Sequence, residues 1–125
     1  MFSKMKAIVM NNFGSPDVLK LGVVERPVPG LGQVLVQVSA TSVNRPDLVQ
    51  REGNYPPPKG ESEILGLEIA GTVAELGCET EGWSVGDRVL ALISGGGYAE
   101  FATAYVGHLI RIPDHMPFVE AACIC

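Results

Sequence analysis

Most of the polar side chains that could do chemistry lie within residues 42–71, SVNRPDLVQREGNYPPPKGESEILGLEIAG. Asn44 offers an amide, a donor and an acceptor that do not titrate, and Tyr55 offers an aromatic face and an O–H donor. Such groups can orient a small molecule and polarise a carbonyl within it. Two plainer interpretations stay open: Asn44 also suits a helix cap, and Tyr55 an exposed aromatic resting on its proline-rich loop.

Two carboxylates, Asp47 and Glu68, share this stretch with the guanidinium of Arg45. Carboxylates placed close together would raise one pKa and could serve as acid and base. Alternatively, Arg45 and backbone donors satisfy both charges, because buried charges usually survive only when they are paired. We therefore expect Arg45, Asp47 and Glu68 to be the scaffold of a site.

The other candidates lie outside this stretch. Tyr98 could line a cleft or simply cover a strand. His108 and His115 have no second ligand or nucleophile nearby in the sequence, which favours solvated loop side chains. The glycines at 95–97 lead into an expected strand, so they lack the pattern of a dinucleotide-binding turn and predict a hairpin turn. The three cysteines have no CxxC spacing, and we expect free thiols.

Composition narrows the classes of protein to consider. The 125 residues are 46% hydrophobic, which predicts one core and one domain. Acidic residues outnumber basic residues by 14 to 9, and the basic residues are scattered, which disfavours nucleic-acid binding. Neither a run of about 18 apolar residues nor a leader-like start is present, so we expect no membrane insertion and a cytoplasmic location.

The elements that must position these groups are mostly short strands. Residues 33–41 alternate between small apolar and mostly polar side chains, which predicts a sheet with one wet face, and Leu35 falls on that polar face. The alternation around Leu21 and Val23 predicts a second, half-buried strand. About six to eight such strands with two short helices predict a mainly β barrel or sandwich.

Two short helices are expected. Ser42 or Asn44 can cap a helix over residues 45–51, because Pro46 suits a first turn. Helical spacing returns after Pro117, and the chain then ends on an apolar, uncapped sequence. We therefore expect the chain to stop inside a helix of a longer protein.

Several motifs occur in a characteristic order: SVNRPDLVQREGNYPPP, ILGLEIAGTVAELG, VGDRVLAL, GGGYAEF and IPDHMPFVEAA. This order resembles the catalytic, GroES-like domain of the medium-chain dehydrogenases/reductases, most of all the zinc-free NADPH-dependent quinone oxidoreductases. The resemblance covers nearly the whole chain. It implies a mainly β, partly open GroES-like barrel with short helices over residues 1–125, cut off before a Rossmann domain that holds the cofactor.

The resemblance also implies a chemistry. Zinc-dependent members have a cysteine at the position of Asn44 and a histidine at that of Leu67, directly before the glutamate matched by Glu68; both are absent here, so no metal site is expected. Similar quinone reductases place Asn44 and Tyr55 beside the nicotinamide of NADPH, with Tyr98 a weaker candidate for the cleft. Hydride would pass to a quinone or a similar electron-poor acceptor.

The complete protein is expected to be a homodimer or a higher homo-oligomer, and the isolated chain to be inactive. A second class of function is a stand-alone β-barrel module for binding or structure, as in co-chaperonins of related architecture. A co-chaperonin needs a long mobile loop, and the proline-rich loop at 53–58 is too stiff to serve as one. A strand, a glycine-rich turn and a helix beyond Cys125 would favour the enzyme.

Overall fold

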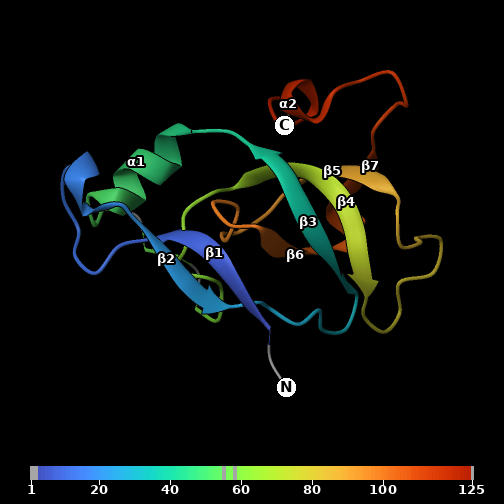
Figure 1. The fold of residues 1–125 in the computed structure, drawn as a ribbon, viewed down its shortest axis with the longest axis horizontal. Coiled ribbons are helices and arrows are strands. Elements are labelled where there is room, and N and C mark those ends of the chain that lie inside the picture. Colours follow the sequence, from blue (N-terminus) through green and yellow to red (C-terminus); the bar gives the residue numbers. More distant parts are fainter. Residues whose placement is uncertain (1–2, 55, 58, 125) are drawn as a thin grey trace.

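The computed structural model describes residues 3–54, 56, 57 and 59–124 (Figure 1). Its strands are β1 (Lys4–Val9), β2 (Lys20–Glu25), β3 (Gln33–Thr41), β4 (Glu68–Leu76), β5 (Arg88–Leu92), β6 (Phe101–Tyr105) and β7 (Leu109–Arg111). The helices are α1 (Arg45–Arg51) and α2 (Phe118–Ala121), with 3₁₀ turns at Pro16–Val18 and Val106–His108. The predicted fold class, mainly β with short helices, is confirmed.

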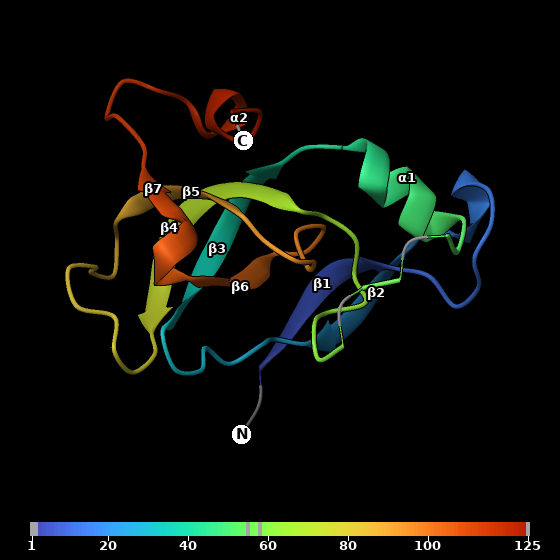
Figure 2. The ribbon, with the colours of Figure 1, turned by 180° about the vertical axis from the view of Figure 1, so that it is seen from behind.

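The strands form two sheets. Five antiparallel strands lie in the order β6-β3-β4-β5-β7, and β1 pairs separately with β2. The β1–β2 hairpin joins the rest through a bridge between Ala7 and Ala99 and through the Ile8 N–H, which donates to the Tyr98 carbonyl at 2.8 Å. Figures 1 and 2 show α1 and this hairpin together at one end of the molecule. The five-stranded sheet curls into the predicted partly open barrel.

The two long strands, β3 and β4, carry the centre of the core. Val34, Leu35 and Val36 are all fully buried. The prediction that Leu35 faces a wet side is therefore wrong. A β-bulge between Leu35 and Val36 interrupts the regular pairing with β4, so simple alternation does not describe this part of β3.

The prediction of a half-buried face around Leu21 and Val23 of β2 is also wrong. Leu21 and Val23 are 70% and 68% exposed, so the predicted half-buried face is not formed by these side chains. Because β2 pairs only with β1, it lies outside the five-stranded sheet, and the described residues leave these two side chains largely uncovered.

The glycines at 95–97 do not form the predicted hairpin. β5 pairs with β4 and β7, whereas β6 pairs with β3, so the glycines carry the chain across the barrel between strands that are not neighbours. On the way, the Gly96 and Gly97 N–H groups donate to the carbonyls of Ile64 and Gly66 at 2.7 and 3.0 Å. A side chain on Gly95 would lie only 2.8 Å from the Ser62 carbonyl oxygen, which explains the need for glycine there.

Helix α1 has the predicted bounds, but α2 ends at Ala121, before the end of the described chain, so the expectation of a helix running to the end is wrong. The last turn tightens because the Cys123 N–H bonds to the Glu120 carbonyl at 3.1 Å. Ala121 and Ala122 pack against Ala70 of β4. Within the described ranges, no helix is long and apolar enough to cross a membrane.

Candidate functional site

The site forms where β3 ends, α1 begins and β4 starts. Asn44 is the N-cap of α1, as the sequence suggested, and its backbone N–H donates to Oδ2 of Asp47 at 3.0 Å. Pro46 occupies the first turn, where its missing N–H costs no hydrogen bond. This local geometry directs the side chains of Ser42 and Asn44 toward Glu68, the first residue of β4.

Glu68 is 2% exposed and makes its contacts through one oxygen. Its Oε1 accepts from the Ser42 hydroxyl at 2.6 Å and from Nδ2 of Asn44 at 3.2 Å. Nδ2 also donates to the Ser42 hydroxyl oxygen, at 3.2 Å. The second oxygen of Glu68, Oε2, is buried and has no hydrogen-bond partner in the part of the chain that the structure describes.

Asp47 is 1% exposed and holds the other side of the site. Its Oδ2 also accepts from the Tyr98 hydroxyl at 2.7 Å, and its Oδ1 accepts from the Gly66 N–H at 3.3 Å. Gly66 has a φ of +110°, and a side chain on it would approach the backbone nitrogen of Tyr98 to 2.6 Å. Glycine at 66 therefore permits the close approach of the two segments that Asp47 connects.

Tyr98 donates its only proton to Asp47. Its partial burial, and next the hydrogen bond with Asp47, raise the pKa of the Tyr98 hydroxyl above its ordinary value. The phenol therefore stays protonated near neutral pH and has no second O–H to donate to a ligand. Tyr98 can therefore contribute its aromatic ring to the wall of a cleft, but no hydrogen-bond donor.

The structure corrects one expectation about the charges. Arg45 is exposed, and no ion pair or hydrogen bond from its side chain to Asp47 or Glu68 is present. Neutral donors contact the two buried carboxylates instead. The expected backbone donors are present on Asp47, as the N–H groups of Asn44 and Gly66, whereas one oxygen of Glu68 has no described partner. The structure thus brings together Asn44, Asp47, Glu68 and Tyr98 but leaves Arg45 outside.

Tyr55, the second predicted catalytic residue, lies outside the described residues, so its predicted role stays a prediction. Ser42 was considered only as a helix cap, and its contact with Glu68 was missed. The two residues are 26 positions apart in the chain, and nothing in the local pattern indicates the contact. His108 and His115 are both exposed and lie away from this cluster, His115 in a loop as predicted and His108 at the end of the 3₁₀ turn Val106–His108.

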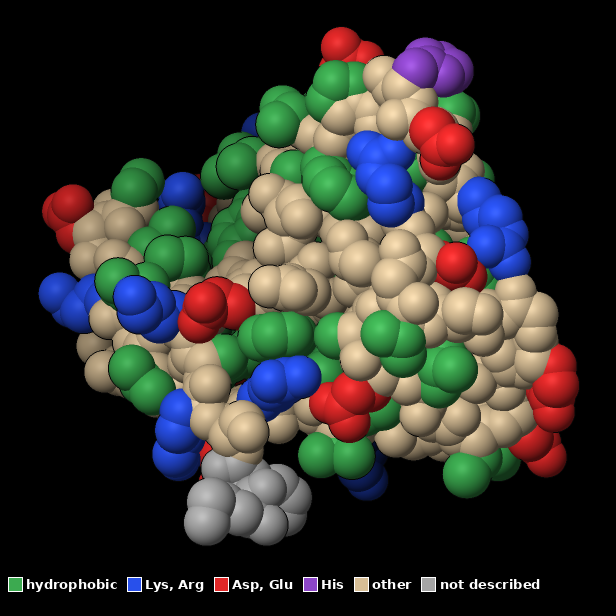
Figure 3. Space-filling view, turned by 45° about the vertical axis from the view of Figure 1, so that its right-hand side comes forward, with side chains coloured by type: hydrophobic (Ala, Val, Ile, Leu, Met, Phe, Trp, Pro, Cys, Tyr) green, Lys and Arg blue, Asp and Glu red, His purple; other side chains and the backbone are tan. Residues whose placement is uncertain are grey.

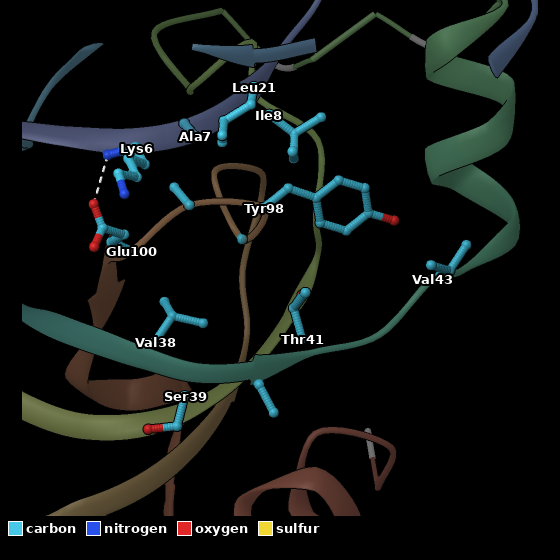
Figure 4. Close-up of a pocket in the computed structure, with 13 residues that line it drawn as sticks. Lys6, Ala7, Ile8, Leu21, Val38, Ser39, Thr41, Val43, Tyr98 and Glu100 are labelled. Carbon is cyan, nitrogen blue, oxygen red and sulfur yellow. Dashed lines mark hydrogen bonds between the residues drawn. The ribbon is translucent and has the colours of Figure 1, made fainter. Parts of the chain in front are cut away.

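An open apolar groove of about 600 Å³ lies beside this cluster, between the β1–β2 hairpin and β3 (Figure 4). Its apolar lining comes from Ala7, Ile8, Leu21, Val38, Ala40, Val43 and the Tyr98 ring. In Figure 4 the Tyr98 hydroxyl points toward α1, and the Lys6 backbone N–H reaches Glu100 at the other end, at 2.6 Å. Leu21 and Val43 are exposed apolar residues, and the sequence pattern indicated neither of them as part of a site.

The next features of the site are the charges on the nearby surface and the side chains that could bind a metal ion. Acidic and basic side chains are interspersed over the face that Figure 3 shows. Within residues 3–54, 56, 57 and 59–124, no three His, Cys, Asp or Glu side chains gather closely enough to hold a metal ion. What the described cluster offers is hydrogen bonding beside an apolar surface.

A comparison with protein-family models shows which family the chain belongs to. The model for the alcohol dehydrogenase GroES-like domain matches residues 30–114, which is well over half of the sequence. This chain belongs to that family. The predicted GroES-like fold of the medium-chain dehydrogenases/reductases is thereby confirmed, and the matched residues include α1, β4 and Tyr98.

Similar proteins extend the comparison. The mouse "Synaptic vesicle membrane protein VAT-1 homolog-like" is 35% identical over 95% of this GroES-like chain, and the "Quinone oxidoreductase" of Lama guanicoe is 36% identical over 96%. The solved structure of mycobacterial Rv1454c complexed with NADPH is 35% identical over 94% of the chain, with a TM-score of 0.82. The chain spans only 28%, 37% and 35% of these three proteins.

Proposed function

We propose that this GroES-like domain is the catalytic-domain portion of an NADPH-dependent quinone oxidoreductase. In the complete protein, hydride passes from NADPH to a quinone or a similar electron-poor acceptor. The observation that carries the proposal is the cluster around Asn44, where an uncharged amide occupies the start of α1 and is held against a buried carboxylate. The similarity to proteins named quinone oxidoreductase supports it.

The cofactor would depend mostly on residues outside this chain. The glycines at 95–97 lead into a bend and β6 rather than into a helix, so the described residues contain no cradle for the phosphates of a dinucleotide. NADPH supplies the hydride when it is bound. Asn44, Tyr55 and the ring of Tyr98 are the residues we propose for the nicotinamide and acceptor cleft, with Asp47 and Glu68 as its scaffold.

Zinc plays no part in the proposed reaction. Asn44 and Leu67 stand where zinc-dependent members have their cysteine and histidine ligands, and zinc in proteins is held by Cys, His or carboxylate groups. A chelator is expected to leave the turnover of the complete protein unchanged. Loss of activity on chelation, restored by zinc, would contradict this part of the proposal.

The decisive experiment uses the complete protein. We expect it to oxidise NADPH faster than NADH when a quinone such as a naphthoquinone is added, and Asn44→Ala to lower kcat/KM. His115→Ala, a change at an exposed loop residue, is the control and should retain full activity. A complete protein that binds neither NADPH nor quinone would refute the proposal and favour a binding or structural module.

Assembly and location are further parts of the proposal. The complete enzyme is a homodimer or a higher homo-oligomer, which light scattering can measure. We also propose that the complete enzyme lies in the cytoplasm. The name of the mouse relative refers to a synaptic vesicle membrane, so cell fractionation is informative: sedimentation with membranes would contradict the cytoplasmic location.

A further inference from the structure

Glu68 determines which end of the Asn44 amide can face it. Oε1 of Glu68 accepts from the Ser42 hydroxyl at 2.6 Å and lies 3.2 Å from Nδ2 of Asn44, so it presents an oxygen acceptor to the amide. If the amide were turned over, its oxygen would meet the carboxylate oxygen with no hydrogen between them. The orientation of Asn44 therefore follows from the chemistry of its neighbour.

Ser42 imposes the same requirement. Its hydroxyl donates its single proton to Glu68 at 2.6 Å, so toward Asn44 it can act only as an acceptor, at 3.2 Å from Nδ2. The two acceptors lie close together on one side of Nδ2. They can therefore share one N–H in a bifurcated hydrogen bond. Both neighbours select the amino end of the Asn44 amide.

The position of Glu68 is itself well determined. Glu68 pairs with Leu92 of β5 in the sheet, and its carbonyl accepts from the Thr41 hydroxyl at 2.6 Å. Its side chain is 2% exposed, and Oε2 has no described partner that would draw the carboxylate away from Asn44. Glu68 is thus a fixed acceptor on the sheet, against which a side chain of the α1 N-terminus is aligned.

We propose that Ser42 and Glu68 are positioning residues that hold the Asn44 amide in one orientation for its ligand. This inference rests on the proposed function, which assigns a ligand to Asn44. Neither residue needs to touch that ligand. Their removal lets the amide rotate, and a misplaced polar group loses much of its contribution to a reaction.

A double-mutant cycle in the complete protein tests the proposal. Glu68→Ala should lower kcat/KM for a naphthoquinone by about 10-fold or more, because small misplacements at a site carry costs of that order. In an Asn44→Ala background the same change should have little further effect, because Glu68 acts through Asn44. Glu68→Gln keeps an oxygen acceptor and should recover most of the activity. Glu81→Ala, at an exposed residue, is the control.

If the losses of kcat/KM in Asn44→Ala and Glu68→Ala simply multiply in the double variant, the positioning role is wrong. Equal losses of kcat/KM in Glu68→Gln and Glu68→Ala would also overturn it. A purely structural role for Glu68 would lower the melting temperature without producing this non-additivity. If Glu68→Ala fails to fold, Ser42→Ala serves instead, because it removes one of the two acceptors, and it should reduce kcat/KM in the same direction. An unchanged kcat/KM in Ser42→Ala would then count against the proposal.

An NMR measurement separates this inference from the proposed function. In the complete wild-type protein, the Nδ2 hydrogens of Asn44 should exchange slowly and have chemical shifts distinct from those of free amides. Glu68→Ala should speed this exchange and move the chemical shifts toward those of free amides, while the circular dichroism spectrum stays unchanged. If the protein reduces no quinone, the proposed function fails, whereas unaltered Asn44 signals in Glu68→Ala would defeat the positioning role alone.

Discussion

Asp47 is the residue on which the polar contacts between α1, residue 66 and Tyr98 converge. Its carboxylate accepts from Asn44, Gly66 and Tyr98, although it is 1% exposed. Three donors allow a buried charge to remain without a cation, because each replaces a hydrogen bond that water would have made. Any change to one donor should therefore affect both the cap of α1 and the wall of the groove.

Tyr98→Phe should lower the free energy of unfolding by about 1–3 kcal/mol, because it leaves buried Asp47 short of one hydrogen bond. The ring, and with it the wall of the groove, is retained. Urea denaturation measures the change. Tyr105→Phe is the matched control, since Tyr105 is 47% exposed, and a similar loss in both variants would contradict the role of the bond to Asp47.

The same hydrogen bond predicts a pH dependence. The pKa of Tyr98 is raised in the folded protein. The protonated Tyr98 hydroxyl therefore contributes its full share to the free energy of unfolding below the unfolded-chain pKa of about 10, and this share is lost as the pH rises from there through the raised folded pKa. Wild-type stability should therefore fall more steeply above about pH 10 than that of Tyr98→Phe. Parallel denaturation curves of the two proteins across that range would be inconsistent with this bond.

At the level of elements, the close approach of β3 and β4 depends on Gly71. A side chain there would overlap the carbonyl oxygen of Gln37 and come within 3.0 Å of the Val36 side chain. Gly71→Ala should thus destabilise the protein by about 3 kcal/mol or more, because a clash between the added Cβ and a backbone oxygen cannot be relieved by a rotamer change. Thermal unfolding measures it. Gly107→Ala, where a side chain meets open space, should change little.

One side chain of β5 makes several contacts with the segment before α2. Arg88 of β5 donates to the carbonyls of Pro113, Asp114 and Met116 and lies over the Phe118 ring, with its guanidinium carbon 4.5 Å from the ring centroid. This guanidinium joins α2 to the sheet through both hydrogen bonds and a cation–π contact.

Arg88→Ala should lower stability by about 1–2 kcal/mol and speed amide exchange over residues 113–121. Hydrogen exchange followed by mass spectrometry can locate the effect. Arg45→Ala, at an exposed arginine of α1, should change stability by no more than about 0.5 kcal/mol. Faster exchange spread evenly over the whole chain would show that Arg88 is not a local anchor.

At the level of the whole molecule, the chain accounts for about a third of the proteins it matches. Its apolar groove and its Asn44 cluster are both built within residues 3–54, 56, 57 and 59–124. The dinucleotide-binding part of the proposed enzyme would have to lie elsewhere. Binding of the cofactor, reduction of the acceptor and assembly are therefore expected only of the complete protein.

The isolated 125-residue chain should bind NADPH weakly and reduce quinones negligibly, because its described residues provide no phosphate cradle. Calorimetric titration of the chain with NADPH measures this directly, with the complete protein as the positive control. A dissociation constant near about 1 μM for the isolated chain would contradict the prediction.

By itself, the sequence determined the elements whose signals are local. Asn44, Pro46 and Asp47 specify the start of α1 through capping and first-turn preferences, and residues 33–41 form β3 as predicted, although their period of two fails at Leu35. The order of motifs also predicted the GroES-like family correctly.

Only the tertiary structure decided how these elements meet. Asn44 and Glu68 are 24 positions apart, and Asp47 and Tyr98 are 51 apart, so both contacts depend on the strand order and on the path of the glycines at 95–97. Local periodicity shows that a strand has a buried face, but it does not show which strand lies beside it. For this reason, the donors to the buried carboxylates are Ser42, Asn44, Gly66 and Tyr98 rather than Arg45.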